Sequence, residues 1–286
     1  MEPIQPLIEQ RLRMPVARLR PVGGGSINAT YRVELTSGTR YFCKHNSAPK
    51  FPHLFSCEAA GLKLIAELAL IRTPRVVDVW EGTADQLLLL EWIDEGEPDR
   101  RFWEGFGRAL AGLHRCCGTR FGGIPDNYMG SVPQSNGAHP DWSSFFFSER
   151  LQPLIRRCRD AGLLPGNTAA AIESLERHLH DLFGNPGPAL LHGDLWSGNF
   201  LCAPGGEPVL IDPAVYYGHP AMDLGMTTLF GGFEAPFYEA YHEVAPLPPN
   251  HREQWDVANL YPLLIHLLLF GRSYLHPIDE TLAAYR

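Results

Sequence analysis

An aspartate, an asparagine and a second aspartate stand close together in the last third of the chain, and their types suit metal-assisted chemistry. Asp194 and Asn199 lie five residues apart in Leu-His-Gly-Asp-Leu-Trp-Ser-Gly-Asn, and Asp212 follows the apolar run 208–211. Phosphoryl transfer needs a carboxylate that accepts the proton of the attacking hydroxyl, and hard oxygen ligands for Mg²⁺ nearby. Alone, an Asp-x-x-x-x-Asn is commonly a turn. Together, the three residues predict Asp194 as the base and Asn199 and Asp212 as Mg²⁺ ligands, brought together by a strand pair between them.

Further polar residues flank this set, and we interpret two of them as structural. His192 and His219 could act in acid–base chemistry, but Asp194 already fills the role of base, and buried histidines commonly satisfy a hydrogen bond. Asp223 is open to two interpretations, as a brace for the loop around Asp194 or as an acidic residue at the start of a helix.

A glycine run near the N-terminus is followed by a lysine and a glutamate in an order that suits nucleotide binding. The run consists of Gly23, Gly24, Gly25 and Ser26. Its backbone N–H groups could approach phosphate oxygens, although a plain hairpin turn has the same composition. Lys44 lies in a predicted strand and can pair with the α- and β-phosphates. Glu58, fourteen residues on, is predicted to begin a helix and hold that lysine in place.

Hydrophobic periodicity predicts an α+β protein with a small β-rich N-lobe and a larger, mainly helical C-lobe. The expected strands are 16–22, 27–35, 41–45, 76–80 and 87–91, with one N-lobe helix at 58–70; the expected helices of the C-lobe include 102–113, 142–159 and 169–182, and two short strands, 189–191 and 209–211, bracket the Asp194 loop. We expect the N-lobe to span 1–91, a polar hinge 92–97, and the C-lobe 98–286. Glu91, Trp92 and Ile93, at the end of the last N-lobe strand, are the expected contacts of the adenine ring.

The composition of the whole chain excludes several classes of protein. Of its 286 residues, 45% are hydrophobic and 20% are charged, which is ordinary for a globular protein. The net charge is −8, and no block of Lys or Arg stands out in the sequence. We therefore expect no nucleic-acid partner. Residues 1–13 lack the apolar core of a secretory signal, and 263–270 is too short to span a bilayer and is expected to be a buried helix. Six cysteines without paired spacing suggest reduced thiols and a cytoplasmic location.

These motifs together resemble the fructosamine kinase family, also called ketosamine 3-kinases. The resemblance covers nearly the whole chain, and Trp196 within the Asp194 loop makes it more specific, because related aminoglycoside and choline kinases usually lack that tryptophan. It implies a protein-kinase-like fold and ATP-dependent phosphorylation of the 3-hydroxyl of a ketosamine, in repair of glycated molecules. It also implies Asp194 as base, Asn199 and Asp212 for Mg²⁺, Lys44 with Glu58 for the phosphates, and 91–93 for adenine.

Two alternatives remain open on the sequence. The first is a kinase of another small hydroxyl substrate, such as an aminoglycoside or choline; the second is a nucleotide-binding pseudokinase, which the presence of Lys44, Asp194 and Asp212 disfavours. The sequence does not specify the sugar, the amine or the oligomeric state. The amine could belong to a small molecule or to a protein. Asn127, Trp142 and Arg150, together with the long stretch 118–140, are our candidates for structural support or substrate contact.

Overall fold

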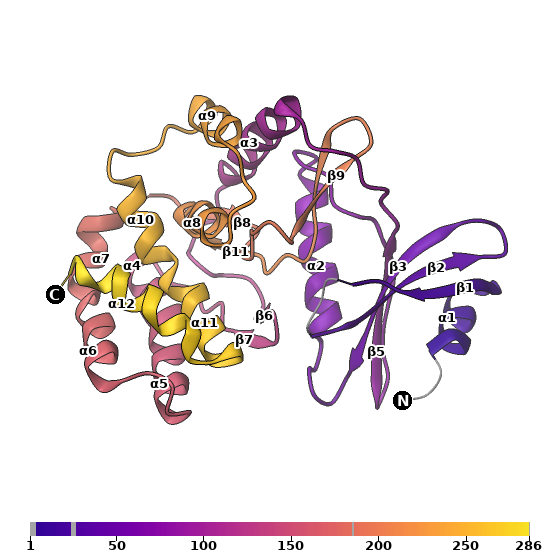
Figure 1. Cartoon of the computed structure of the whole chain (residues 1–286), viewed down its shortest axis with the longest axis horizontal. Helices are drawn as coiled ribbons and strands as arrows, with labels where there is room; N and C mark the ends of the chain where they lie inside the picture. The colour runs from indigo at the N-terminus through magenta and orange to yellow at the C-terminus, as the bar shows by residue number, and fades with distance from the viewer. Residues whose placement is uncertain (1–3, 24–26, 185, 286) are drawn as a thin grey trace.

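A five-stranded antiparallel sheet forms one side of the molecule and a mainly helical lobe the other (Figure 1). The computed structural model describes residues 4–23, 27–184 and 186–285. The strands, in sheet order, are β1 (Val16–Pro21), β2 (Ala29–Leu35), β3 (Arg40–Ser47), β5 (Asp85–Glu91) and β4 (Val76–Glu81). All five predicted strands are present, and the α+β class is confirmed.

Alternation along these strands divides their side chains between two helices. Helix α1 (Ile4–Leu12) inserts Ile8 among Val33, Leu35, Cys43 and Leu89 on one face of the sheet. On the other face, α2 (Leu54–Glu67) packs against Leu88 and Leu90. The prediction of a single N-lobe helix was therefore wrong. Helix α1 is short and buries only Ile8 completely, so its sequence carries little periodic signal.

The helical lobe surrounds one large apolar core. Its helices are α3 (Arg100–His114), α4 (Trp142–Phe145), the π-helix η1 (Phe146–Leu151), α5 (Gln152–Asp160), α6 (Gly166–Ser174), α7 (Glu176–Phe183), α8 (Ala221–Leu229), α9 (Ala235–Val244), α10 (His251–Ala258), α11 (Leu260–Phe270), the 3₁₀-helix η2 (Arg272–Tyr274) and α12 (Leu275–Ala283). The segment 263–270 belongs to the largely buried α11, as predicted, although Leu269 and Phe270 at its end are exposed. In the described part of the chain, no helix is both long and apolar enough to cross a membrane.

Three short antiparallel pairs complete the helical lobe and frame its functional loops. They are β6 (Asn127–Met129) with β7 (Val132–Gln134), β8 (Ala189–Leu191) with β11 (Tyr216–Gly218), and β9 (Phe200–Ala203) with β10 (Glu207–Leu210). The predicted strands 189–191 and 209–211 both exist, but each pairs with a different partner. The β9–β10 hairpin returns the chain from Asn199 to Asp212, as expected.

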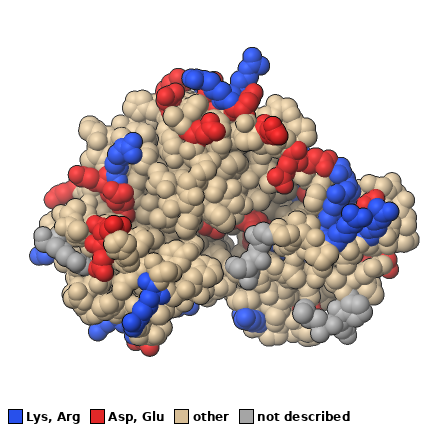
Figure 2. Space-filling model, in the orientation of Figure 1, with Lys and Arg blue, Asp and Glu red and all other residues tan. Residues whose placement is uncertain are grey.

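Most of the face in Figure 2 is uncharged, its acidic and basic side chains gather mainly near the margins, and a hollow lies between the two lobes. Acidic side chains are visible at the base of this hollow. All six cysteines are free thiols.

Candidate active site

A cavity of about 360 Å³ lies between the sheet and the helical lobe. It brings together residues far apart in the chain that the sequence had singled out: Gly23, Lys44, Glu58, Glu91, Trp92, Ile93, Asn127, Asp194, Trp196, Asn199 and Asp212. Of the predicted glycine loop, Gly24, Gly25 and Ser26 lie outside the described residues.

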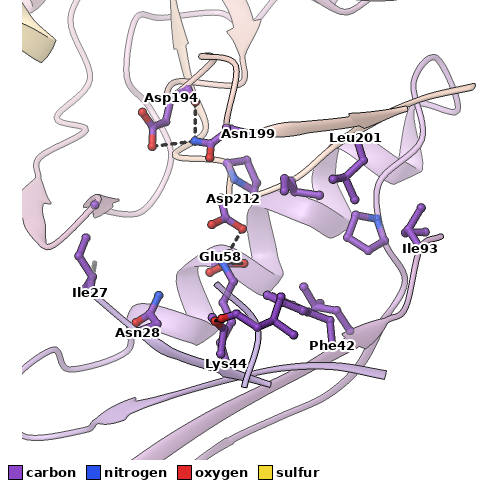
Figure 3. Close-up of a pocket in the computed structure, with 18 of the residues that line it drawn as sticks. Ile27, Asn28, Phe42, Lys44, Glu58, Ile93, Asp194, Asn199, Leu201 and Asp212 are labelled. Atoms are coloured by element: carbon purple, nitrogen blue, oxygen red, sulfur yellow. Dashed lines mark hydrogen bonds and ion pairs between the residues drawn. The ribbon is translucent and has the colours of Figure 1, made fainter. Parts of the chain in front are cut away.

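The loop that carries Asp194 is shaped by its own side chains. Asn199 Nδ2 donates hydrogen bonds to the Asp194 carbonyl (2.7 Å) and to Asp194 Oδ2 (3.0 Å) (Figure 3). Gly193 has φ +84°, and a Cβ there would overlap the carbonyl of Ala214, so only glycine fits this close approach. Burial, followed by the charge of Asp212, raises the pKa of Asp194 to about 7, with the Asn199 hydrogen bond opposing the shift.

A buried aspartate on α8 holds the start of this loop. Asp223 accepts hydrogen bonds from the backbone N–H of His192 (2.7 Å) and Gly193 (2.8 Å), and lies 3.1 Å from His114 Nε2. Burial alone would raise the pKa of Asp223, but these partners outweigh it and lower the pKa. His114 was missed from the sequence, because nothing local marks a contact across 109 residues.

His192 links the loop to the strand end before Asp212. Its Nε2 lies 2.9 Å from the carbonyl of Ile211, and its Nδ1 accepts from the backbone N–H of Asp194. This pattern assigns the ring proton to Nε2, and burial lowers the His192 pKa, so the ring is neutral. His192 therefore makes structural hydrogen bonds and does not line the cavity.

The lysine of β3 lies between two carboxylates. Lys44 Nζ forms ion pairs with Glu58 Oε1 of α2 (2.8 Å) and with Asp212 Oδ1 (Figure 3). Burial alone would lower the pKa of Lys44, but the charges of Asp212 and Glu58 outweigh it and raise the pKa. Burial raises the pKa of Glu58 to about 7, even though Lys44 opposes the shift. Helix α2 begins at Leu54, so Glu58 lies in its second turn and not at its start, as the sequence had suggested.

The oxygen atoms around Asp212 suit a divalent cation. Asn199 uses its Nδ2 on Asp194, and its amide oxygen lies on the side of Asp212 in Figure 3. Asp212 keeps 41% of its side chain exposed in the cavity. One amide and one carboxylate oxygen fit Mg²⁺, which takes few ligands from protein and the rest from phosphates and water. Within the described residues, no cluster of three His, Cys, Asp or Glu side chains offers a closed metal cage.

Known proteins resemble this chain over most of its length. The family model for fructosamine kinases matches residues 2–285. A "Probable ketoamine kinase" of Synechocystis sp. is 39% identical, covering 92% of this chain and 88% of that protein. A chloroplastic protein-ribulosamine 3-kinase of Arabidopsis thaliana is 36% identical, and the match covers 91% of this chain and 79% of that protein. The crystal structure of a "putative fructosamine-3-kinase" from Thermobifida fusca superposes with a TM-score of 0.90 at 34% identity, covering 99% of this chain and 98% of the other.

The chain belongs to the fructosamine kinase family. Its two-lobed fold is that of protein-kinase-like phosphotransferases, which the aminoglycoside phosphotransferase of Streptomyces rimosus shares with a TM-score of 0.56 at 18% identity. At that identity the likeness concerns the fold alone.

The part of the cavity next to residues 91–93 has apolar walls. Leu90, Ile93, Leu201 and Ile211 line it, and no helix or strand continues between Glu91 and α3. The Glu91 carboxylate accepts hydrogen bonds from Arg72 (2.6 Å) and from the backbone N–H of Arg75. A ligand beside segment 91–93 would therefore form hydrogen bonds with the backbone of this segment.

The far end of the cavity, on the helical lobe, is bounded by an aromatic ring. Trp196 lines the cavity and packs edge-on against the exposed Phe230, with ring centroids 5.7 Å apart. A Cβ at Gly198 would collide with the Trp196 ring, so this glycine allows the indole to lie across its own loop.

The three candidates for support or substrate contact differ in whether they line the cavity. Trp142 and Arg150 are both fully buried and line no part of the cavity, so they do not reach a ligand there. Asn127 lines the cavity, but its side chain donates to the carbonyl of Val215 (2.7 Å).

Proposed function

We propose that this protein is an ATP-dependent kinase that phosphorylates the 3-hydroxyl of ketosamines. The observation that carries the proposal is the arrangement of Asp194, Asn199, Asp212 and Lys44 around one cavity. A base, two oxygen ligands and a phosphate-binding cation are the groups that phosphoryl transfer requires.

In this mechanism Asp194 receives the proton of the substrate hydroxyl. The hydroxyl oxygen forms a bond to the γ-phosphorus of ATP while the bond from that phosphorus to the bridging oxygen breaks, and ADP leaves. Lys44, held by Glu58, neutralises phosphate charge, and the backbone of 91–93 binds adenine against the apolar walls. Asn199 and Asp212 would hold Mg²⁺, which would supply charge stabilisation for the transferring group.

The ketosamine substrate is inferred from relatives and from the aromatic wall. The similar proteins are named as ketoamine and protein-ribulosamine kinases, and Trp196, two residues from Asp194, offers an apolar face to a sugar ring. The aminoglycoside phosphotransferases that resemble this chain in structure, which favour the alternative of an aminoglycoside kinase, are distant, at 14–20% identity. Because all six thiols are unpaired, we place the reaction in the reducing cytoplasm.

Asp194→Asn tests the proposal. We expect wild-type protein to release ADP from Mg·ATP with fructosamine or ribulosamine, and the variant to lose at least about 10³-fold in kcat, because the amide cannot accept the proton. Asp181→Asn, on the exposed surface of α7, is the matched control and should remain active. Turnover on choline or an aminoglycoside alone would reassign the substrate, and ATP binding without turnover on any of them would support a pseudokinase.

A further inference from the structure

Arg150 is an unusual charge in the core of the helical lobe. It lies on the π-helix η1, has 0% of its surface exposed, and stacks against the rings of Tyr216 (4.1 Å) and Phe145 (4.5 Å). Among the described residues, no carboxylate forms an ion pair with it; its neighbour Glu149 pairs with His139 instead. A buried charge without a counter-ion is costly, and π-helical turns are frequent at functional sites. This combination calls for a role beyond packing.

The hydrogen bonds of Arg150 start a chain of buried amides. Its guanidinium donates to the carbonyl of Ser135 (2.5 Å) and to Asn136 Oδ1 (2.7 Å). Asn136 Nδ2 donates in turn to Asn127 Oδ1 (3.3 Å). The same oxygen accepts a hydrogen bond from Gln134 Nε2 (2.7 Å), and Gln134 Oε1 accepts one from the hydroxyl of Tyr261 (2.7 Å).

Two members of this chain, Asn127 and Gln134, reach the backbone just after Asp212. Asn127 Nδ2 donates to the carbonyl of Val215 (2.7 Å), and Gln134 Nε2 donates to the carbonyl of Ala214 (3.2 Å). From the other side, the backbone N–H of Ala214 donates to the carbonyl of His192 (2.8 Å). The segment 213–215 is therefore fixed between the Asp194 loop and the amide network.

The backbone of Asp212 itself explains why such fixation matters. Asp212 has φ +55°, a left-handed conformation that is uncommon for a residue other than glycine. Strained backbone of this kind persists where the surroundings over-determine it. The residues that directly follow Asp212 are the nearest places where surrounding groups can hold this backbone conformation.

We propose that Arg150, Asn136, Asn127 and Gln134 form one network of positioning residues, which holds Asp212 in the orientation that binds Mg²⁺. Of its four members, only Asn127 lines the cavity, and its side-chain amide donates to the carbonyl of Val215; the network acts through the backbone of 213–215. This inference rests on the proposed role of Asp212 in Mg²⁺ binding.

Gln134→Leu is the most direct test, because Gln134 is buried and does not line the cavity. The Mg²⁺ concentration for half-maximal activity should rise about tenfold, as for other residues that support metal ligands, while KM for the ketosamine stays unchanged. Amide hydrogen exchange in 212–216 of the free protein should become faster than in wild type. Arg150→Met should produce the same two changes.

Gln254→Leu is the matched control. Gln254 is also a buried glutamine whose Nε2 donates to a backbone carbonyl, that of Leu182 (3.0 Å), but it connects α10 to α7. It should lose stability without changing the Mg²⁺ dependence or the exchange in 212–216. Gln134→Asn, too short to reach Ala214, repeats the test with less change to the core if the leucine variant does not fold.

Equal Mg²⁺ dependence and equal exchange in the Gln134 and Gln254 variants would overturn the network. Absence of kinase activity in wild type would instead overturn the proposed function, and the exchange measurement on the free protein would still decide whether the network fixes 212–216.

Discussion

At the scale of single residues, the ionisation of Asp194 sets the pH range of the proposed reaction. Its pKa is raised to about 7, mainly by burial and then by the charge of Asp212. The base acts only when ionised, so kcat/KM should fall about tenfold per pH unit below pH 7 and level off above it. Initial rates with subsaturating ketosamine between pH 5.5 and 9 measure this.

The control for this prediction is Glu58, whose pKa is also raised to about 7. Glu58→Gln should lower activity but keep the acid limb, because the limb belongs to Asp194. A profile that is flat down to pH 5.5 in wild type, or that loses its limb in the glutamine variant, would contradict the assignment.

Residue types and local spacing were enough to find the groups around the cavity, and not enough to find what supports them. Asp194, Asn199 and Asp212 lie within one hairpin and its flanks, so their proximity follows from local structure. Gln134 meets Ala214 across 80 residues, and such a contact leaves no periodic or spacing signal in the sequence. The burial of Arg150 could not be predicted from the sequence either, because arginine is ordinarily a surface residue.

At the scale of elements, the close approach of α2 to the Asp212 segment couples the two lobes. A Cβ at Gly61 would lie 3.2 Å from Val215 Cγ2 and 3.3 Å from Pro213 Cγ. Gly61→Leu should therefore push α2 outward, lower the free energy of unfolding by about 1–3 kcal/mol, and raise KM for ATP, because Glu58 one turn away loses its contact with Lys44. Urea unfolding and ATP-dependent kinetics measure the two effects.

Gly105→Leu in α3 is the matched control, since a Cβ there would have no atom within 4 Å apart from its chain neighbours and the backbone of its own helix. That variant should be as stable as wild type or more stable, because leucine favours a helix over glycine by roughly 0.5–1 kcal/mol. If Gly61→Leu kept wild-type stability and KM for ATP, the coupling through α2 would be refuted.

Among the elements, strands were predicted better than helix ends and pairings. Strand alternation between two covering helices gives a clear period of two, whereas α1 has few apolar positions and escaped notice. Helix α2 ends at Glu67, and Ala69, at φ +52°, has already left the helical conformation, although the apolar pattern runs on to Leu70. Pairing of β8 with β11 depends on tertiary packing that no local pattern encodes.

At the scale of the whole molecule, polar contacts join the two lobes at two places. Arg72 bridges Glu91 of the sheet (2.6 Å) and Glu207 of the β9–β10 hairpin (2.7 Å). In β6, the hydroxyl of Tyr128 donates to the carbonyl of Pro52 (2.9 Å). The long segment 118–140 thus serves partly as a contact between lobes, which a search for substrate residues in the sequence did not suggest.

The response of the whole fold to acid should depend on His219, which is buried beside α8. Burial lowers the pKa of His219 to about 4, although a backbone hydrogen bond with Phe183 opposes the shift. Between pH 6.5 and 4 the unfolded chain binds a proton there that the folded protein does not, so stability is full above pH 6.5 and falls as the pH decreases, by roughly 3 kcal/mol in total. Urea unfolding of wild type and His219→Gln across this range should show a smaller loss in the variant. His276→Gln, at an exposed histidine, should behave as wild type. Equal losses in wild type and His219→Gln would mean that other groups govern acid unfolding.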